Sequence, residues 1–301
     1  MREGDNPTEV RDFSAVLSAR LEGDLPLLVG GHAVNLWAWV YRERIGAAIN
    51  QWLPLTSKDL DLVGTIAMLE ELKQHFGGTY RLSGPRGPVV GQMSLSLGGK
   101  ELKIDVLRSV FGLGPKDLKG ATPLLELEDE GGRFRARVVL PVILFQAKIA
   151  NLAKLEQVGR NDFKHVNLML LVMEAYLTEF IEATESGALD SRGAINQLEL
   201  ARKVIASPEA IKCTATHGID FRGIWPRELL HGAKDPRLQN FERLILRRQN
   251  FWSPMCQIFA WHMIRPLLRQ ERSLHRSIVG FLKYNQKRVQ YFLQGQGSRA
   301  F

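Results

Sequence analysis

The stretch LLVGGHAVNLWAWV, Leu27–Val40, joins a short apolar run to a helix-type pattern through Gly30 and Gly31. The apolar run predicts a strand at Leu25–Val29, and the following pattern predicts a helix at His32–Arg44. Two interpretations of the glycine pair are open. The pair is either a tight turn that needs a positive φ, or a turn whose backbone approaches a phosphate beside the free N–H groups of the helix.

Outward from this stretch, the first half of the chain alternates between helix and strand patterns. A helix is expected at Thr8–Leu21, and the period-two pattern KDLDLVG predicts a strand at Lys58–Gly64. The next segment, TIAMLEELKQHFGG, is typical of a short helix that ends at its glycine pair. Further strands are expected between Gly/Pro turns at Thr79–Leu82, Gln92–Leu97, Leu102–Leu107 and Phe134–Leu140.

Helical patterns replace strands after Pro141, which suits the first position of a helix because its missing N–H costs nothing there. We therefore expect an α+β protein, with a mixed-sheet domain at 1–140 and an all-helical domain at 141–301. The helices are expected in PVILFQAKIANLAKLEQ and at Phe163–Ala183, Ala194–Ile205, Arg237–Arg248 and much of Ser253–Leu293.

The composition is that of an ordinary globular protein, with 45% hydrophobic and 24% charged residues among 301. Its two cysteines, Cys213 and Cys256, are too few for a disulfide framework and lack metal-site spacing, which fits a reducing cytoplasm. The N-terminus lacks the apolar core of a signal peptide, and the apolar runs are too short to cross a bilayer. We expect a cytoplasmic location and no membrane role.

The net charge of +8 is concentrated near the C-terminus, where the segment from Arg243 onward holds eleven Lys/Arg and one acid, Glu271. Helical spacing places six of these cations on one stripe, which is either a solvated face or a surface for an anionic partner. Such a partner is RNA, including tRNA, or an acidic antitoxin protein. The six residues are Arg265, Arg269, Arg272, Arg276, Lys283 and Lys287.

Acidic residues mark two of the predicted strands. Asp59 and Asp61 are two residues apart, so both point to one face, while Asp105 interrupts the apolar pattern of ELKIDVLRS. Carboxylates on one face repel each other unless a cation lies between them, and hard oxygen ligands suit Mg²⁺. A solvent-facing strand explains the pair equally well, whereas three converging carboxylates would form a two-metal site.

The order of these features resembles the polymerase-β-type nucleotidyltransferase fold over roughly the first 165 residues. The resemblance is carried by Gly30–Gly31, by TSKDLDL with its two aspartates, and by Asp105. TSKDLDL is similar to the Ser/Thr-x-Asp-x-Asp form of the AbiEii-like branch, which includes abortive-infection proteins and toxins of toxin–antitoxin pairs. That branch follows its core with a lysine, an arginine and an aspartate, here Lys148, Arg160 and Asp162. His165 stands where the branch often has a second aspartate.

This resemblance implies roles for the marked residues. The glycine pair, Ser57 and Lys148 would bind the nucleoside triphosphate (NTP), and Asp59, Asp61 and Asp105 would hold two Mg²⁺ ions. Lys148 and Asp162 would join the three carboxylates in catalysis. From the residues alone, other interpretations stay open: a solvent-seeking Lys148, a turn-capping Ser57 and Asp162 as the N-cap of a helix. His32 either contacts nucleotide or metal or is a polar surface group.

The function expected from these features is transfer of NMP from an NTP to an acceptor hydroxyl, with RNA or tRNA as the acceptor of a toxin-like enzyme. Two alternatives are an inactive nucleotidyltransferase-fold binding module and a small-molecule nucleotidyltransferase of the antibiotic-modifying kind.

Overall fold

The computed structural model describes residues 7–119, 122–129 and 132–251. The chain divides into two compact units, Met1–Gln249 and Asn250–Phe301, and the account below concerns the first. The predicted helix at Ser253–Leu293 and its six-cation stripe lie outside the described residues.

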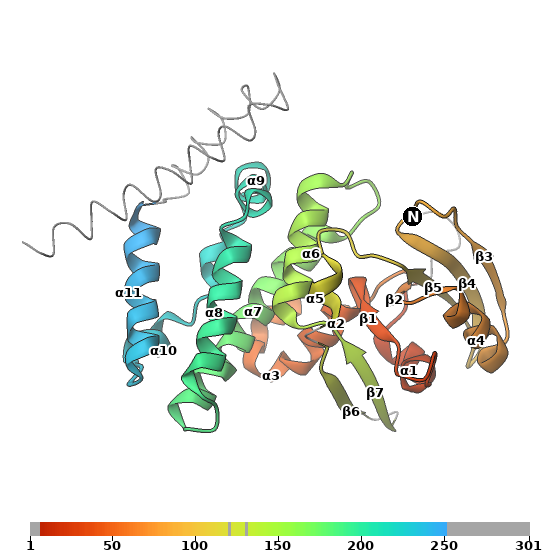
Figure 1. The fold of residues 1–301 in the computed structure, drawn as a ribbon, viewed down its shortest axis with the longest axis horizontal. Coiled ribbons are helices and arrows are strands. Elements are labelled where there is room, and N and C mark those ends of the chain that lie inside the picture. The colour runs from red at the N-terminus through yellow and green to blue at the C-terminus, as the bar shows by residue number, and fades with distance from the viewer. Residues whose placement is uncertain (1–6, 120–121, 130–131, 252–301) are drawn as a thin grey trace, which may run out of the picture. The chain divides into compact units, whose positions relative to one another are not determined.

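A seven-stranded mixed sheet organises the first half of the chain, in the order β3-β4-β5-β2-β1-β7-β6 (Figure 1). The β1–β7 and β2–β5 pairs are parallel and the other neighbours are antiparallel. The strands are β1 (Leu27–Val29), β2 (Leu60–Val63), β3 (Thr79–Leu82), β4 (Val89–Leu97), β5 (Lys100–Leu107), β6 (Leu124–Asp129) and β7 (Gly132–Val138). The strand expectations are confirmed, and β6 is an addition to them.

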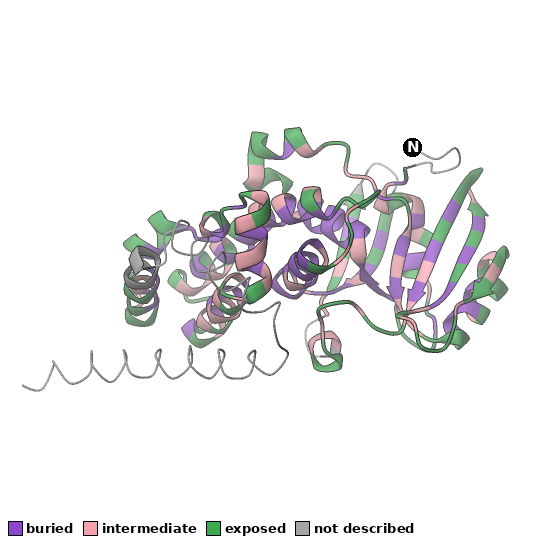
Figure 2. Ribbon diagram, turned by 90° about the horizontal axis from the view of Figure 1, so that it is seen from above, coloured by how far each residue is buried: buried purple, intermediate pink, exposed green. Residues whose placement is uncertain are grey.

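Alternation along the strands explains how the sheet meets its core. In β5, Leu102, Ile104 and Val106 are buried, while Lys103 and Asp105 point to the other face. Figure 2 shows this banding of buried and more exposed residues across the strands. The short strand β1 is buried along its whole length, because it lies at the centre of the sheet.

Short helices surround the sheet in this half of the chain. The expected helix at Thr8–Leu21 is shorter in the structure, because the backbone becomes extended at Ala19. The expected helix at His32–Arg44 begins two residues earlier, at Gly30. These elements are η1 (Val10–Phe13), α1 (Ser14–Ser18), α2 (Gly30–Val40), α3 (Arg42–Ile45), η2 (Gly46–Trp52), α4 (Ile66–Phe76) and α5 (Pro115–Lys119).

Helices alone follow β7, as the pattern after Pro141 predicts, and Pro141 occupies the first turn of α6. The structure adds two helices that the pattern did not indicate, α9 and α10. The described elements are α6 (Pro141–Lys154), α7 (Asp162–Glu185), α8 (Ser191–Ile205), α9 (Pro208–His217), η3 (Phe221–Ile224), α10 (Arg227–Gly232) and α11 (Pro236–Phe251). Within the described ranges, every helix is too short or too polar to cross a bilayer.

Helix α6 links the sheet to the helices that follow. Eleven of its fourteen residues are buried, so it is covered on nearly all sides rather than along one stripe. It contacts α2, which packs on the sheet, and the helices α7, α8 and α9. The core is therefore continuous from the sheet into the helical half of the first unit.

Candidate functional site

A single row of side chains crosses five neighbouring strands of the sheet. Backbone register aligns Arg81 of β3 with Gln92 of β4, Gln92 with Asp105 of β5, and Asp105 with Asp61 of β2. Asp61 in turn lies opposite Val29, the last residue of β1 before the glycine pair. Two carboxylates from distant parts of the chain are thus direct neighbours on strands about 4.8 Å apart.

The row is held by hydrogen bonds between side chains. Arg81 donates from Nη2 to Gln92 Oε1 at 3.3 Å, and Gln92 donates from Nε2 to Asp105 Oδ1 at 3.0 Å. Gln92 therefore fixes one oxygen of Asp105, and the amide orientation is set by its contact with Arg81. The sequence patterns gave no sign of Gln92, because its role depends on the pairing of β4 with β5.

Gly30 and Gly31 are required by two close approaches. Gly30 has a φ of +72°, and a Cβ added to it would lie 2.5 Å from Asp61 Cγ and overlap the carboxylate oxygen. A Cβ on Gly31 would lie 2.5 Å from Ser57 Oγ. Gly30 has the positive φ that the tight-turn interpretation requires, whereas Gly31 does not, and the side chains that approach the turn in this structure include Asp61 and Ser57. Phosphate contact stays a prediction.

Burial and like charge raise the pKa of both carboxylates in the row. For Asp61, burial is the main cause, Asp59 adds to it, and the resulting pKa is about 7. Lys148 and the Gly31 N–H, which donates to Asp61, oppose this rise in pKa. Burial and Asp59 also raise the pKa of Asp105, against the hydrogen bond from Gln92. The three carboxylates are close enough to repel one another. A cation among them would lower the free-energy cost of ionising them.

The donor set fits a hard divalent ion that keeps part of its hydration shell. Among the residues that the structure describes, no three or more His, Cys, Asp or Glu side chains form a cluster that could hold a metal ion. Asp61 and Asp105 are hard oxygen donors of the kind that Mg²⁺ prefers, since this ion usually takes one or two carboxylates and completes its shell with water and substrate phosphates. They do not match a site that the protein encloses completely.

Lys148 lies inside the protein, on α6, and does not reach for solvent. It is 5% exposed, and its Nζ lies 3.5 Å from Asp162 Oδ1. Asp162 is 2% exposed and accepts a second bond, 2.7 Å long, from Arg160 Nε. Asp162 is the first residue of α7 rather than its N-cap, which is Asn161. Lys148 also attracts Asp61 electrostatically, so it connects the α6–α7 pair to the carboxylate row.

Two buried histidines lie behind the glycine turn. The interpretation of His32 as a surface group is wrong, because the side chain is fully buried and its Nε2 lies 3.1 Å from Thr8 Oγ1. Burial lowers the pKa of His32 to about 4. His165 is 5% exposed, and its two ring nitrogens have no hydrogen-bond partner among the described residues. Burial, then Lys148 and Lys164, lower its pKa well below 6.5, so both imidazoles are neutral.

Ser57 is buried beside this turn and is tied to the N-terminal segment. Its backbone N–H and C=O pair with those of Thr8 at 3.0 and 2.8 Å, and the Thr8 hydroxyl also donates to the Ser57 carbonyl. Thr8 is thus hydrogen-bonded to both His32 and Ser57, and these bonds hold the N-terminal segment beside the glycine turn. Of the sequence-predicted residues, the structure brings together Gly30, Gly31, Ser57, Asp59, Asp61, Asp105, Lys148 and Asp162.

Comparison with known proteins gives one distant likeness. No protein-family model matches the chain, and no curated protein matches it. The chain is similar to a solved structure described as an antigenic nucleotidyltransferase-like protein from Paracoccidioides brasiliensis. The two share 14% identity with a TM-score of 0.34, over 55% of this chain and 78% of that chain.

Proposed function

We propose that the protein is a nucleotidyltransferase that transfers NMP from an NTP to an acceptor hydroxyl. The observation that carries the proposal is the register of β2 with β5, which sets Asp61 beside Asp105 directly under the Gly30–Gly31 turn. Paired carboxylates beside a helix N-terminus combine cation ligands with backbone N–H groups that favour a phosphate.

Different residues of the chain would contact different parts of the substrate. The α2 N-terminus and Ser57 would bind phosphate oxygens, and buried Lys148 would supply a positive charge near the carboxylate row. Asp162 and Arg160 hold that lysine in place through the contacts described above. Because Asp162 touches Lys148 rather than the row, we assign it to positioning.

In the reaction, the acceptor oxygen attacks the α-phosphorus and the bond to the β-phosphate oxygen breaks, releasing pyrophosphate. Asp105, whose pKa is raised, would take the acceptor proton. Asp59, Asp61 and Asp105 would hold Mg²⁺, which supplies charge neutralisation on the phosphates when bound. Most of the rate enhancement would come from positioning and charge, as in other phosphoryl-group transfers.

For the acceptor we propose an RNA or tRNA hydroxyl, with a toxin-like role of the AbiEii kind and a cytoplasmic site of action. Support comes from the lysine, arginine and aspartate that follow the core, since Lys148, Arg160 and Asp162 form one connected group. The six C-terminal cations, spaced for one face of a helix, are the proposed contacts to RNA or to an acidic antitoxin.

The test is label transfer. The full chain is incubated with each α-labelled NTP, Mg²⁺ and total RNA, and both labelled RNA and pyrophosphate are measured. We expect transfer by the wild type and its loss in Asp61→Asn and Asp105→Asn. Glu101→Gln is the matched control, because Glu101 lies on the same face of β5, about 13 Å from Asp105.

Two outcomes would replace the proposal. One outcome is pyrophosphate release that requires a small cationic acceptor and leaves the RNA unlabelled. It would indicate a small-molecule nucleotidyltransferase. Thermal stabilisation by NTP with no pyrophosphate from any nucleotide would indicate an inactive binding module. Activity that survives Asp61→Asn unchanged would place the chemistry elsewhere.

A further inference from the structure

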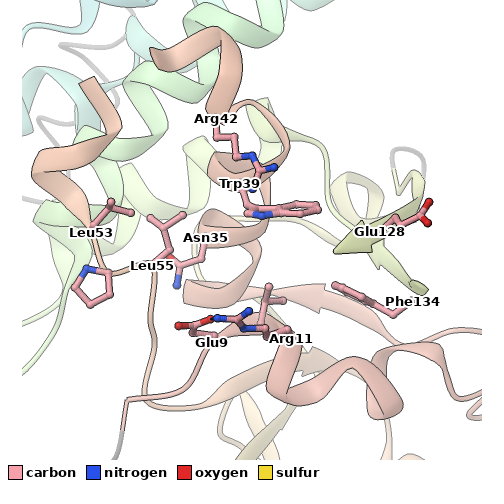
Figure 3. Close-up of a pocket in the computed structure, with 11 residues that line it drawn as sticks. Glu9, Arg11, Asn35, Trp39, Arg42, Leu53, Leu55, Glu128 and Phe134 are labelled. Atoms are coloured by element: carbon pink, nitrogen blue, oxygen red, sulfur yellow. Dashed lines mark ion pairs between the residues drawn. The ribbon is translucent and has the colours of Figure 1, made fainter. Parts of the chain in front are cut away.

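A pocket of about 730 Å³ lies along α2 (Figure 3), and neither Asp61 nor Asp105 of the carboxylate row lines it. Its walls come from α2 and the first residue of α3, from residues 9–11 at the start of η1, from the loop at 53–55 and from strands β6 and β7. Asn35 and Trp39 face it from α2, about 7 and 13 Å along the helix from Gly30. Its volume falls within the range of roughly 300–1,000 Å³ that is typical of small-molecule sites.

Asn35 is the observation that points to a ligand. The side chain is 1% exposed, and neither its Nδ2 nor its Oδ1 has a hydrogen-bond partner among the described residues. Figure 3 shows it projecting from α2 beside Leu55. Buried side-chain polar atoms nearly always have partners, so a donor and an acceptor left together at the wall of a pocket indicate a ligand or water that completes them.

The walls around Asn35 are suited to a flat, apolar body. Trp39 presents its indole, Phe134 its ring and Leu55 its side chain. The Arg42 guanidinium lies 5.2 Å from the centre of the Trp39 ring. In Figure 3, Arg42 is on one side of this ring, and Arg11 and Phe134 are on the other, across the pocket. A planar group entering there would lie against aromatic surface with its edge toward Asn35.

Charge at the pocket favours an anion on that planar group. The two carboxylates that line it are both bound to arginines: Glu9 to Arg11 at 2.6 Å and Glu128 to Arg133 at 3.1 Å. Arg42 is exposed at the same pocket and stacks on the indole. With the acids paired, the guanidinium of Arg42 is available to attract a phosphate at the mouth.

We propose that this pocket binds one nucleotide unit, with the base edge on the Asn35 amide, the base plane against Trp39 and the phosphate near Arg42. A side-chain amide matches the adjacent donor and acceptor of a nucleobase edge, and aromatic rings stack bases of any sequence. The site is separate from the carboxylate row and requires neither Mg²⁺ nor catalysis.

The experiment measures binding of AMP, GMP, CMP and UMP to the full chain in EDTA, by calorimetry and by tryptophan fluorescence. We expect at least one mononucleotide to bind and to quench fluorescence. Asn35→Leu should weaken that binding by about tenfold or more, the size of a lost bidentate amide–base contact. Trp39→Phe should keep binding within about threefold, because the ring still stacks, and lose most of the quench.

Control variants separate this site from the proposed catalytic one. Asp61→Asn should leave mononucleotide binding in EDTA unchanged, and Asn35→Leu should not lower the melting temperature, because the amide it removes is unpaired. A short single-stranded oligoribonucleotide is then tested as a competitor of the mononucleotide. Competition in the wild type, and not in Asn35→Leu, would show that the nucleotide unit bound in the pocket belongs to an RNA strand. Without such competition, the source is the free nucleotide.

Three binding results would each overturn the proposal. They are the absence of mononucleotide binding at millimolar concentration, equal affinity of wild type and Asn35→Leu, and loss of binding in Asp61→Asn. A marked fall in the melting temperature of Asn35→Leu would also overturn it, since it would show that the amide is satisfied within the fold. Trp39→Ala, which removes the stacking surface without touching Asn35, must weaken binding as well.

Discussion

Asp61 should make the metal-free protein less stable as the pH rises from acid to neutral. Its pKa is 3.8 for the free side chain and about 7 in the folded protein, because burial and Asp59 oppose its ionisation. Between these values the unfolded chain loses the proton and the folded protein keeps it. The free energy of unfolding therefore falls with rising pH over this window, and the full penalty is present above pH 7.

The size of the effect follows from the shift. At about 1.36 kcal/mol for each pKa unit, the difference between 3.8 and 7 amounts to at most about 4 kcal/mol. About 2 kcal/mol of this falls between pH 5 and 7, where most proteins stay folded. Relaxation of the neighbouring carboxylates would reduce these figures, since Asp59 and Asp105 titrate with Asp61.

Urea unfolding in EDTA, at half-unit steps from pH 5 to 8, measures the pH dependence of the free energy of unfolding for wild type and Asp61→Asn. The variant carries no charge at this position, so its stability relative to wild type should increase by a few kcal/mol across the range. Glu101→Gln should track the wild type. Adding Mg²⁺ above pH 7 should restore stability to the wild type far more than to Asp61→Asn. A stability difference that stays constant from pH 5 to 8 would refute the crowded-carboxylate argument.

Three further substitutions test the site. Gly30→Ala should lower the melting temperature and abolish label transfer, because its Cβ would overlap Asp61. Gly23→Ala is the control: it has similar φ strain with open space around it, and should lower the free energy of unfolding by only about 1 kcal/mol. Gln92→Leu should raise the pKa of Asp105 further and move the acid limb of the activity–pH profile to higher pH, and an unmoved profile would exclude the positioning role. Lys148→Met should lower the free energy of unfolding, measured in urea, by about 3 kcal/mol, because the buried Asp162 then keeps only its contact with Arg160. The variant should also abolish label transfer. Retained transfer would exclude Lys148 from the catalytic site.

Local patterns were sufficient for most elements of the fold. The alternation in KDLDLVG and ELKIDVLRS identifies β2 and β5, because one face of each strand is buried and the other carries the aspartates. Pro141 marks the start of α6 for a backbone reason that does not depend on tertiary contacts. By contrast, β6 escaped prediction, because its LLELED sequence mixes apolar and acidic residues that are typical of helices as well as edge strands.

The arrangement of the site depends on pairings that no local pattern contains. The register of β4 with β5 places Gln92 beside Asp105, yet these residues are thirteen apart in the chain. The burial of His32 depends on Thr8, twenty-four residues away. Likewise, the pocket at Asn35 needs segments from four separate parts of the sequence. Each of these features becomes visible only when nonlocal backbone pairing is known.

The Gly31 N–H bears on both interpretations of this turn, the tight turn and the phosphate contact. In the structure this N–H donates to Asp61, so the carboxylate takes the place at the helix N-terminus that an incoming phosphate would need. A cation at the row would attract the Asp61 carboxylate and compensate for the loss of that hydrogen bond, freeing the N–H for phosphate. Because binding energies are reciprocal, the phosphate must then favour the cation as much as the cation favours the phosphate. On the proposed function, the crowding that costs stability in the free protein would therefore also couple the binding of metal and nucleotide.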